Sequence, residues 1–194
     1  MKRFLSCILI CVLLATTIVL TSCGLDGIYF YRLNSDRDGY VISAVIKGKL
    51  IVVQGDIIPE SYNGLPVTEI AQGGFAGWEY LFDITIPGCV EKIGTYAFGS
   101  SGLVLATVEE GTRIIGDYAF TNSQLNEISL PESIEYIGAG AFGNCQLLTL
   151  INYSGTVAQW NDVEKGDGWC AFTGGDEGIL SISCSDGVLS ILTE

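Results

Sequence analysis

The stretch RIIGDYAFTNS, residues 113–123, decides the fold of this chain because the pattern of its central six residues recurs elsewhere in the sequence. The stretches KIGTYAFGSS (92–101) and YIGAGAFGNC (136–145) repeat the same Ile-Gly-x-x-Ala-Phe frame. A weaker copy, IAQGGF, covers residues 70–75. Such even recurrence indicates an internal repeat. The phenylalanines that end the four copies are spaced by 23, 22 and 22 residues: Phe75, Phe98, Phe120 and Phe142.

Each copy is followed by an apolar-x-x-apolar-x-apolar segment, such as Leu125-x-x-Ile128-x-Leu130. A period of roughly 20–29 residues with this segment is typical of a leucine-rich-repeat solenoid. We expect each segment to form a short strand with one face inward, and strands of neighbouring copies to stack in parallel about 4.8 Å apart. The Ile-Gly-x-x-Ala-Phe frame is expected to form a helical or irregular return segment, with the phenylalanine packed between two coils. The repeat region, 67–156, divides into four coils of 22–23 residues: 67–89, 90–111, 112–133 and 134–156.

The repeat resembles that of the BspA-type leucine-rich-repeat surface proteins of bacteria. The stretch SLPESIEYIGAGAFGNC (129–145) is similar to their repeat, and YNGLPVTEIAQGGF (62–75) to their opening repeat. INYSGTVAQWNDV (151–163) and SISCSDG (181–187) resemble their closing segment. The resemblance covers roughly residues 59–187 and implies a right-handed solenoid with parallel strands on its concave face. It also implies a cell-surface location and adhesion to host or matrix proteins.

Two residues depart from the family pattern. Glu109 stands where proline is usual, and Ala71 stands where glycine is usual. The other offsets recur together with their residue types, which makes the resemblance specific.

The residues before the repeats, 23–66, are expected to form a linker and a β-rich N-terminal cap. Alternating apolar runs surround two turns, at 34–39 and 47–49. This pattern predicts a hairpin or a three-stranded cap over the first coil.

The residues after the repeats, 157–194, are expected to form a C-terminal cap. Solenoids need such caps because the inner face of a terminal coil is otherwise open. Trp160 and Trp169 are the side chains expected to shield the last coil.

The first 22 residues are expected to be a lipoprotein signal peptide. Lys2 and Arg3 precede an uncharged run over 4–20, which is shorter than the roughly 20 apolar residues of a spanning helix. The following Leu-Thr-Ser-Cys-Gly resembles the bacterial lipoprotein cleavage box. The resemblance implies cleavage before Cys23 and diacylation of its thiol, so that lipid anchors the protein to the membrane of the cell envelope. An ordinary signal peptide and an uncleaved anchor are the alternatives.

The charge of the chain limits the classes of partner that it can bind. With 9 basic and 22 acidic residues, the net charge is −13, and loss of Lys2 and Arg3 would bring it to −15. Such a surface repels phosphate backbones, so no nucleic-acid partner is expected, and contact with the membrane is expected through the lipid alone. Cationic partners are compatible with this charge, and acidity also favours solubility.

The remaining cysteines show no dense disulfide framework. Cys170 and Cys184 are the best candidates for a disulfide pair, because export permits oxidation but no Cys-x-x-Cys spacing occurs.

The sequence predicts no enzymatic site, cofactor or metal. The chain has no histidine, which removes Ser-His and Cys-His nucleophile pairs and histidine-based zinc sites. Cys145 stands at a repeat position that is Ser101 and Ser123 in other coils, which favours a packed core thiol over a nucleophile. The stretch NSDRDG (34–39) matches half of a calcium loop, but Val45 stands where a bidentate Glu is required. A polar hairpin turn is therefore favoured there.

An acidic loop gives the weakest of the functional hypotheses. Asp162, Glu164 and Asp167 lie close together in the sequence near two tryptophans. A glycosidase carboxylate pair or a weak cation site is conceivable there. A solvated loop on an acidic protein is the favoured interpretation.

The residues that alternate with the apolar positions of each strand are the candidate binding residues, because they are expected to point out from the concave face. One column of them is polar and could bind an extended peptide or a glycan. Strand propensity and cross-strand pairing alone also explain this column. The leading hypothesis is therefore a protein- or glycan-binding surface module, and the alternative is an envelope spacer without a specific ligand. The candidates are Thr85, Leu105, Thr107, Glu127, Ser129, Leu150 and Asn152.

Overall fold

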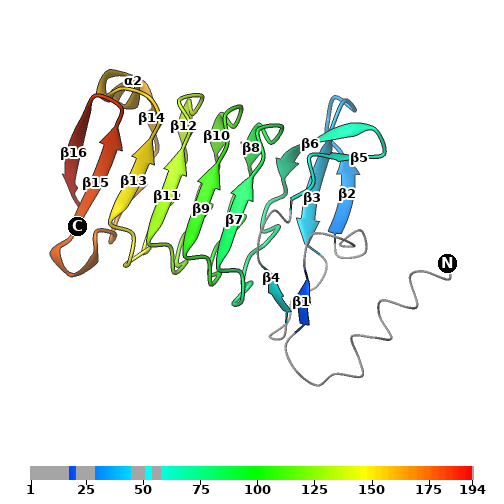
Figure 1. Cartoon of the computed structure of the whole chain (residues 1–194), viewed down its shortest axis with the longest axis horizontal. Helices are drawn as coiled ribbons and strands as arrows, with labels where there is room; N and C mark the ends of the chain where they lie inside the picture. Colours follow the sequence, from blue (N-terminus) through cyan, green and yellow to red (C-terminus); the bar gives the residue numbers. More distant parts are fainter. Residues whose placement is uncertain (1–17, 21–28, 45–50, 54–57, 194) are drawn as a thin grey trace.

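The computed structural model describes residues 18–20, 29–44, 51–53 and 58–193, and the repeats form a β-solenoid (Figure 1). Successive coils stack along one axis. Each coil contributes one strand to a six-stranded sheet and one to an eight-stranded sheet on the other side. The predicted leucine-rich-repeat solenoid with parallel strands is confirmed.

The six-stranded sheet is built from the apolar-x-x-apolar-x-apolar segments, in the order β16–β15–β13–β11–β9–β7. Its neighbours are parallel except for the antiparallel pair β15 and β16. In the four-residue strands the second and fourth side chains are buried and the other two face solvent, as the alternation predicts. The strands are β7 (Asp83–Ile86), β9 (Leu105–Val108), β11 (Glu127–Leu130), β13 (Leu150–Tyr153), β15 (Ile179–Cys184) and β16 (Gly187–Leu192).

The eight-stranded sheet closes the opposite side of the coils, in the order β14–β12–β10–β8–β6–β3–β2, with β5 paired to β6. The return segment, predicted as helical or irregular, begins with a two-residue parallel strand and continues as turns. Two residues are too few to produce an alternating sequence pattern. The strands are β2 (Tyr29–Leu33), β3 (Tyr40–Ala44), β5 (Ser61–Tyr62), β6 (Leu65–Ile70), β8 (Lys92–Ile93), β10 (Ile114–Ile115), β12 (Tyr136–Ile137) and β14 (Glu164–Lys165).

The repeated phenylalanines form one continuous stack between the sheets. The ring centroids of Phe75 and Phe98 lie 5.3 Å apart, and Phe120 and Phe142 follow at 5.2 and 5.4 Å, with planes 9–14° from parallel. All four rings are completely buried. Each phenylalanine therefore fills the space between two coils, as expected.

The glycine of the Ile-Gly frame is required by the distance between coils. A Cβ atom added to Gly116 would lie 2.8 Å from the main-chain nitrogen of Thr95 and 2.9 Å from the carbonyl carbon of Gly94 in the preceding coil. Real Cβ atoms rarely approach main-chain atoms so closely. The small residue therefore lets two corners stack at the spacing of a parallel sheet.

The N-terminal cap is a hairpin that extends the eight-stranded sheet. Strands β2 and β3 pair antiparallel, and β3 pairs parallel with β6 beside the first coil. In the turn between them, the side-chain oxygen of Asn34 accepts hydrogen bonds from the main-chain N–H groups of Asp38 (3.2 Å) and Gly39 (3.4 Å). The polar hairpin turn predicted for 34–39 is thus confirmed. The second predicted turn, 47–49, lies outside the described residues.

The N-terminal region before this hairpin is described only in part. Strand β1 (Ile18–Leu20) pairs in parallel with β4 (Ile51–Val53). Most of the predicted signal peptide, and Cys23 itself, lie outside the described residues. Within the described part of the chain, no helix has the length and apolar character needed to cross a membrane.

The residues after the fourth coil continue both parallel sheets by one strand each. Strand β14 pairs with β12, and β15 pairs with β13, so 157–184 has the course of a further coil. Its return segment has Gly166 at the glycine position and buried Cys170 at the phenylalanine position. Between β13 and β14 lies the six-residue helix α2 (Val157–Asp162), and before β15 lies the short 3-10 helix η1 (Gly175–Glu177).

Helix α2 is held at both ends by hydrogen bonds and closes the fourth coil. At its start, the hydroxyl of Thr156 accepts a hydrogen bond from the N–H of Gln159, whose side chain accepts one from the N–H of Thr156. At its end, the ammonium of Lys165 donates to the carbonyls of Trp160 (2.6 Å) and Val163 (2.7 Å). Trp160 packs edge-to-face on Trp169, which packs edge-to-face on Phe142. The two tryptophans therefore shield the fourth coil, as predicted.

Candidate binding face

The candidate binding residues all lie on the exposed face of the six-stranded sheet. Their side chains are exposed or half-buried, and those between them are buried. We call this surface, including the matching residues of β15, the ladder face. Leu105 is its most exposed large apolar side chain, with 48% of its surface accessible.

The strand register brings the predicted residues together in two columns. In the first column, Thr85 lies opposite Thr107, Thr107 opposite Ser129, and Ser129 opposite Asn152. Because neighbouring strands are about 4.8 Å apart, this column presents one short polar side chain per strand spacing. The second column runs through Asp83, Leu105, Glu127 and Leu150.

Strand β15 adds two residues to the ladder face that the sequence analysis missed. Ser183 lies opposite Asn152 and extends the polar column, and Ser181 lies opposite Leu150 and extends the second column. Paired residues of β13 and β15 are 31 positions apart, nine more than the 22-residue period, because the segments that contain α2 and η1 lengthen this coil. This departure from the period hid the strand. The alternation Leu180-x-Ile182, with both residues buried, was the available signal.

Three hydroxyl groups of the polar column have no hydrogen-bond partner in the part of the chain that the structure describes. Within the described part of the chain, the side chains of Thr107, Ser129 and Ser183 make no hydrogen bond. The amide of Asn152 donates to the carboxylate of Glu127, which links the two columns diagonally. Unpaired hydroxyls next to a fixed amide form a set of donors and acceptors in a row.

The polar column opens into a hollow of about 620 Å³ at the carboxyl ends of the strands. Its apolar lining includes Leu130, Pro131 and Tyr153. Its combination of apolar wall and a few polar groups suits a ligand with both kinds of surface. The polar residues that line it are Glu110, Ser129, Asn152, Ser154, Ser183 and Ser185.

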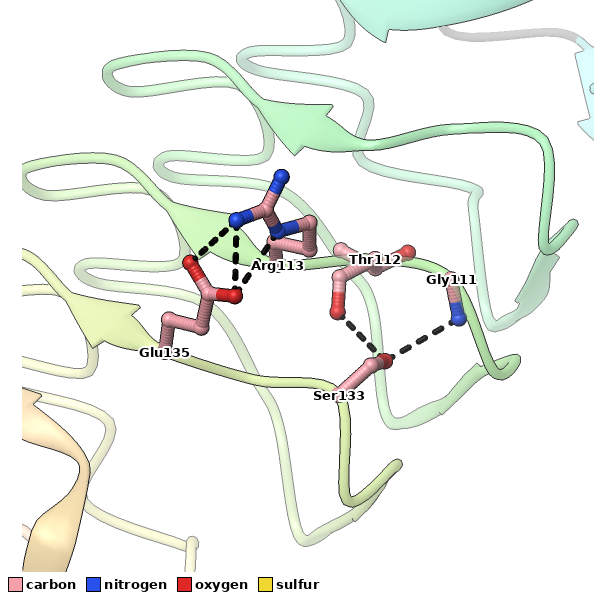
Figure 2. A network of polar contacts seen from close by, with 5 residues as sticks. All are labelled: Gly111, Thr112, Arg113, Ser133 and Glu135. Carbon is pink, nitrogen blue, oxygen red and sulfur yellow. Dashed lines mark hydrogen bonds and ion pairs between the residues drawn. The ribbon is translucent and has the colours of Figure 1, made fainter.

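A second hollow, of about 380 Å³, lies beside the eight-stranded sheet and has a different character. Its two cations are already paired. Arg113 donates two hydrogen bonds to Glu135, from Nε to Oε1 (2.9 Å) and from Nη2 to Oε2 (2.8 Å), as Figure 2 shows. Lys92 lies 3.8 Å from Glu69. Because both cations are paired with carboxylates of neighbouring coils, this hollow presents fewer unpaired polar groups to a ligand than the ladder face does.

The same region shows how the corners of two coils are joined. The hydroxyl of Ser133 accepts a hydrogen bond from the N–H of Gly111 (3.0 Å) and donates one to the carbonyl of Thr112 (2.8 Å) (Figure 2). These contacts connect main chain that is otherwise unpaired at the corner. Their role is structural.

The cysteines have structural positions. The thiol of Cys145 is buried and donates to the carbonyl of Phe120 (3.0 Å), next to the hydroxyl of Ser123. Burial raises the pKa of Cys145 to about 11, so the thiol stays protonated at neutral pH. The interpretation as a packed core thiol is confirmed. Cys170 and Cys184 are both free, so the structure does not contain the disulfide considered for them.

The acidic loop forms no recognisable metal centre. Among the described residues, no group of three or more histidine, cysteine or acidic side chains is arranged to hold a metal ion. Asp162 ends α2, and Glu164 begins β14. The loop is therefore part of the further coil, 157–184.

Comparisons with known proteins agree with this architecture. The sequence matches the model of the BspA type leucine rich repeat region, in six copies, over residues 60–163, which is more than half of the chain. A comparison with curated proteins found no match. Among solved structures, the T. pallidum leucine rich repeat protein TpLRR is similar with a TM-score of 0.62 and 29% identity, over 76% of this chain and 67% of that chain.

The pneumococcal vaccine antigen PcpA shares the fold, with a TM-score of 0.53 and 20% identity. The match covers 80% of this chain and 51% of that chain, so this chain spans about half of the antigen's length. The stacked coils, the phenylalanine frame and the match over 60–163 lead to one assignment. This chain belongs to the BspA-type leucine-rich-repeat family.

Proposed function

We propose that this protein is an extracytoplasmic, lipid-anchored bacterial surface protein that binds an extended protein segment or a glycan through the ladder face. The observation that carries the proposal is the row of unpaired hydroxyls of Thr107, Ser129 and Ser183 around Asn152. Extended polymers repeat their own donors and acceptors along one direction. A row of short polar side chains at strand spacing can satisfy several of them at once.

The family assignment and the resemblance of residues 20–24 to a lipoprotein cleavage box support the location on the surface. Cleavage before Cys23 and diacylation of its thiol would hold the solenoid at the outer side of a membrane. The acidic character of the chain, with a net charge of −13, favours neutral or basic ligands. The function proposed is binding, without catalysis.

The experiment is a binding screen of the protein against extracellular-matrix proteins and glycans, with quantitative titration of each hit. Thr107→Lys and Ser129→Lys place a long charged side chain on the polar column, and each should weaken binding at least tenfold. Thr95→Lys makes the same chemical change at an exposed residue outside the ladder face and should leave the affinity unchanged. An affinity that survives both ladder-face changes would exclude this surface as the site. A screen without any hit at micromolar concentration would favour the spacer alternative.

The anchor has a separate test. Cells that produce the protein are grown with labelled palmitate, and the label is followed on the purified chain. The wild-type protein should carry the label, and Cys23→Ala should lose it. Label that persists in Cys23→Ala would contradict lipidation at this residue, whatever the screen finds.

A further inference from the structure

Strand β16 is the outermost strand of the six-stranded sheet. It pairs with β15 over all six of its residues, Gly187–Leu192, without a register shift. On its other side no described segment lies along it (Figure 1). A strand of this length at a sheet edge offers a row of main-chain donors and acceptors to another strand.

The direction of those groups follows from one hydrogen bond just beyond the strand. The N–H of Thr193 donates to the carbonyl of Gly178 (2.9 Å), which continues the register of the β15–β16 pair. In an antiparallel pair, main-chain groups of alternate residues point toward the partner. Residues 187, 189 and 191 therefore bond to β15, and the N–H and C=O groups of Val188, Ser190 and Leu192 point away from the sheet.

This edge lacks the features that usually protect a sheet edge. Natural edge strands carry charges, proline or bulges that prevent another strand from pairing. The sequence of β16, GVLSIL, has no charge and no proline, although the chain as a whole has a net charge of −13. Val188 and Leu192 are 66% and 78% exposed, among the most accessible large apolar side chains of the described residues.

We propose that β16 pairs with β16 of a second copy of this chain, antiparallel and centred on Ser190. In this register Val188 lies opposite Leu192 of the partner subunit, and the two copies of Ser190 lie opposite each other. The inner residues match as well, because Leu189 meets the partner's Ile191. The strand is therefore complementary to itself, which is what a two-fold interface requires.

The hydrogen bonds fit the same register. Val188, Ser190 and Leu192 are the residues whose main-chain groups point outward, and each would form a hydrogen-bonded pair with its counterpart. The uncharged strand also lets two acidic molecules meet where local repulsion is smallest. The two ladder faces would then lie on the same side of one continuous sheet.

The test is disulfide trapping in the full-length chain. In a hydrogen-bonded antiparallel pair the two Cα atoms are about 5.5 Å apart, which a disulfide spans. Under mild oxidation, Ser190→Cys should therefore give a covalent homodimer on non-reducing gels, several-fold more than the wild-type chain. Ser100→Cys, which changes another exposed serine on a coil corner, is the matched control and should stay at the wild-type level.

A second change tests the register. Leu192→Asp, added to Ser190→Cys, buries a charge against Val188 of the partner subunit and should remove most of the dimer. Its exposed position means that the fold itself should tolerate the change, which circular dichroism checks. A Ser190→Cys dimer no stronger than that of Ser100→Cys, a dimer insensitive to Leu192→Asp, or cross-linking to a different protein instead would each overturn the proposal.

Discussion

The rings of Phe98 and Phe120 stack 5.2 Å apart, 10° from parallel, and so join two successive coils at their centre. Both rings are completely buried. Phe120 also stacks on Phe142 at 5.4 Å, so it lies inside the stack with a ring on each side. The stability of the solenoid should depend on this continuity, since each coil contacts mainly its neighbours.

Replacement of Phe120 by alanine should lower the free energy of unfolding by about 3–5 kcal/mol, because it leaves a cavity between two rings. Urea denaturation followed by circular dichroism measures the loss. Phe82→Ala is the matched control: this ring is 42% exposed, and its removal should cost much less. Equal losses in the two variants would contradict a central role for the stack.

Replacement of Gly116 by alanine should lower stability by about 1–3 kcal/mol, because the new Cβ collides with the main chain of the preceding coil. Ala71 occupies the matching position of the first coil, where the preceding segment is strand β3 instead of a coil corner, and its N–H donates to Ile42. Ala71→Gly should cost less than about 1 kcal/mol, through backbone entropy alone. Thermal unfolding of the pair distinguishes the two effects; a harmless Gly116→Ala would refute the close approach.

Stability should fall with rising pH in a way that depends on Cys145. Burial raises the pKa of this thiol from 9.0 to about 11, so the folded state favours the neutral form. The resulting stabilisation is complete below pH 9 and is lost as the pH rises through 11, with a total of about 3 kcal/mol. Cys145→Ser should remove this component and keep the fold, because serine stands at this position in two other coils.

The measurement is urea unfolding of wild-type and Cys145→Ser protein at pH 8 and pH 10.5. The wild-type chain should lose more stability between these values than the variant does. Cys184→Ser is the control, since Cys184 is only half-buried and should contribute little. Identical pH dependence of the wild-type chain and Cys145→Ser would count against burial of the thiol.

The ion pair of Arg113 and Glu135 should contribute little to stability, and only at low salt. Both side chains are more than half exposed, and water and ions screen such pairs. Glu135→Gln should lower the melting temperature slightly at low ionic strength and not at all in molar salt. Melting curves at two salt concentrations check this, and a large loss that persists in molar salt would show that the pair has a structural role beyond charge.

The repeat offsets predicted the solenoid because each coil buries the same positions as its neighbours. The outward columns were predictable for the same reason, since alternation in a strand assigns Thr107 and Ser129 to one face. The two-residue strands such as β8 were not predictable, because their pairing depends on contacts between coils. Ser181 and Ser183 were missed because α2 and the replacement of phenylalanine by Cys170 break the frame of the last coil.

The in-register ladders also determine how the length of this protein can change. A duplication of one 22-residue segment would insert a whole coil and lengthen the ladder face by about 4.8 Å, without altering any existing neighbour. A deletion or insertion of one residue inside a strand would move the side chains of that strand out of register with both neighbours, whereas the spacings of 23 and 22 residues between successive phenylalanines show that a one-residue difference elsewhere in a coil is tolerated. The six residues of α2 show the other permitted change, in which extra chain leaves the stack at a corner and returns to it in register. Gene duplication can therefore change the length of the ladder face in steps of one strand. Point substitutions can independently change the outward side chains of each strand.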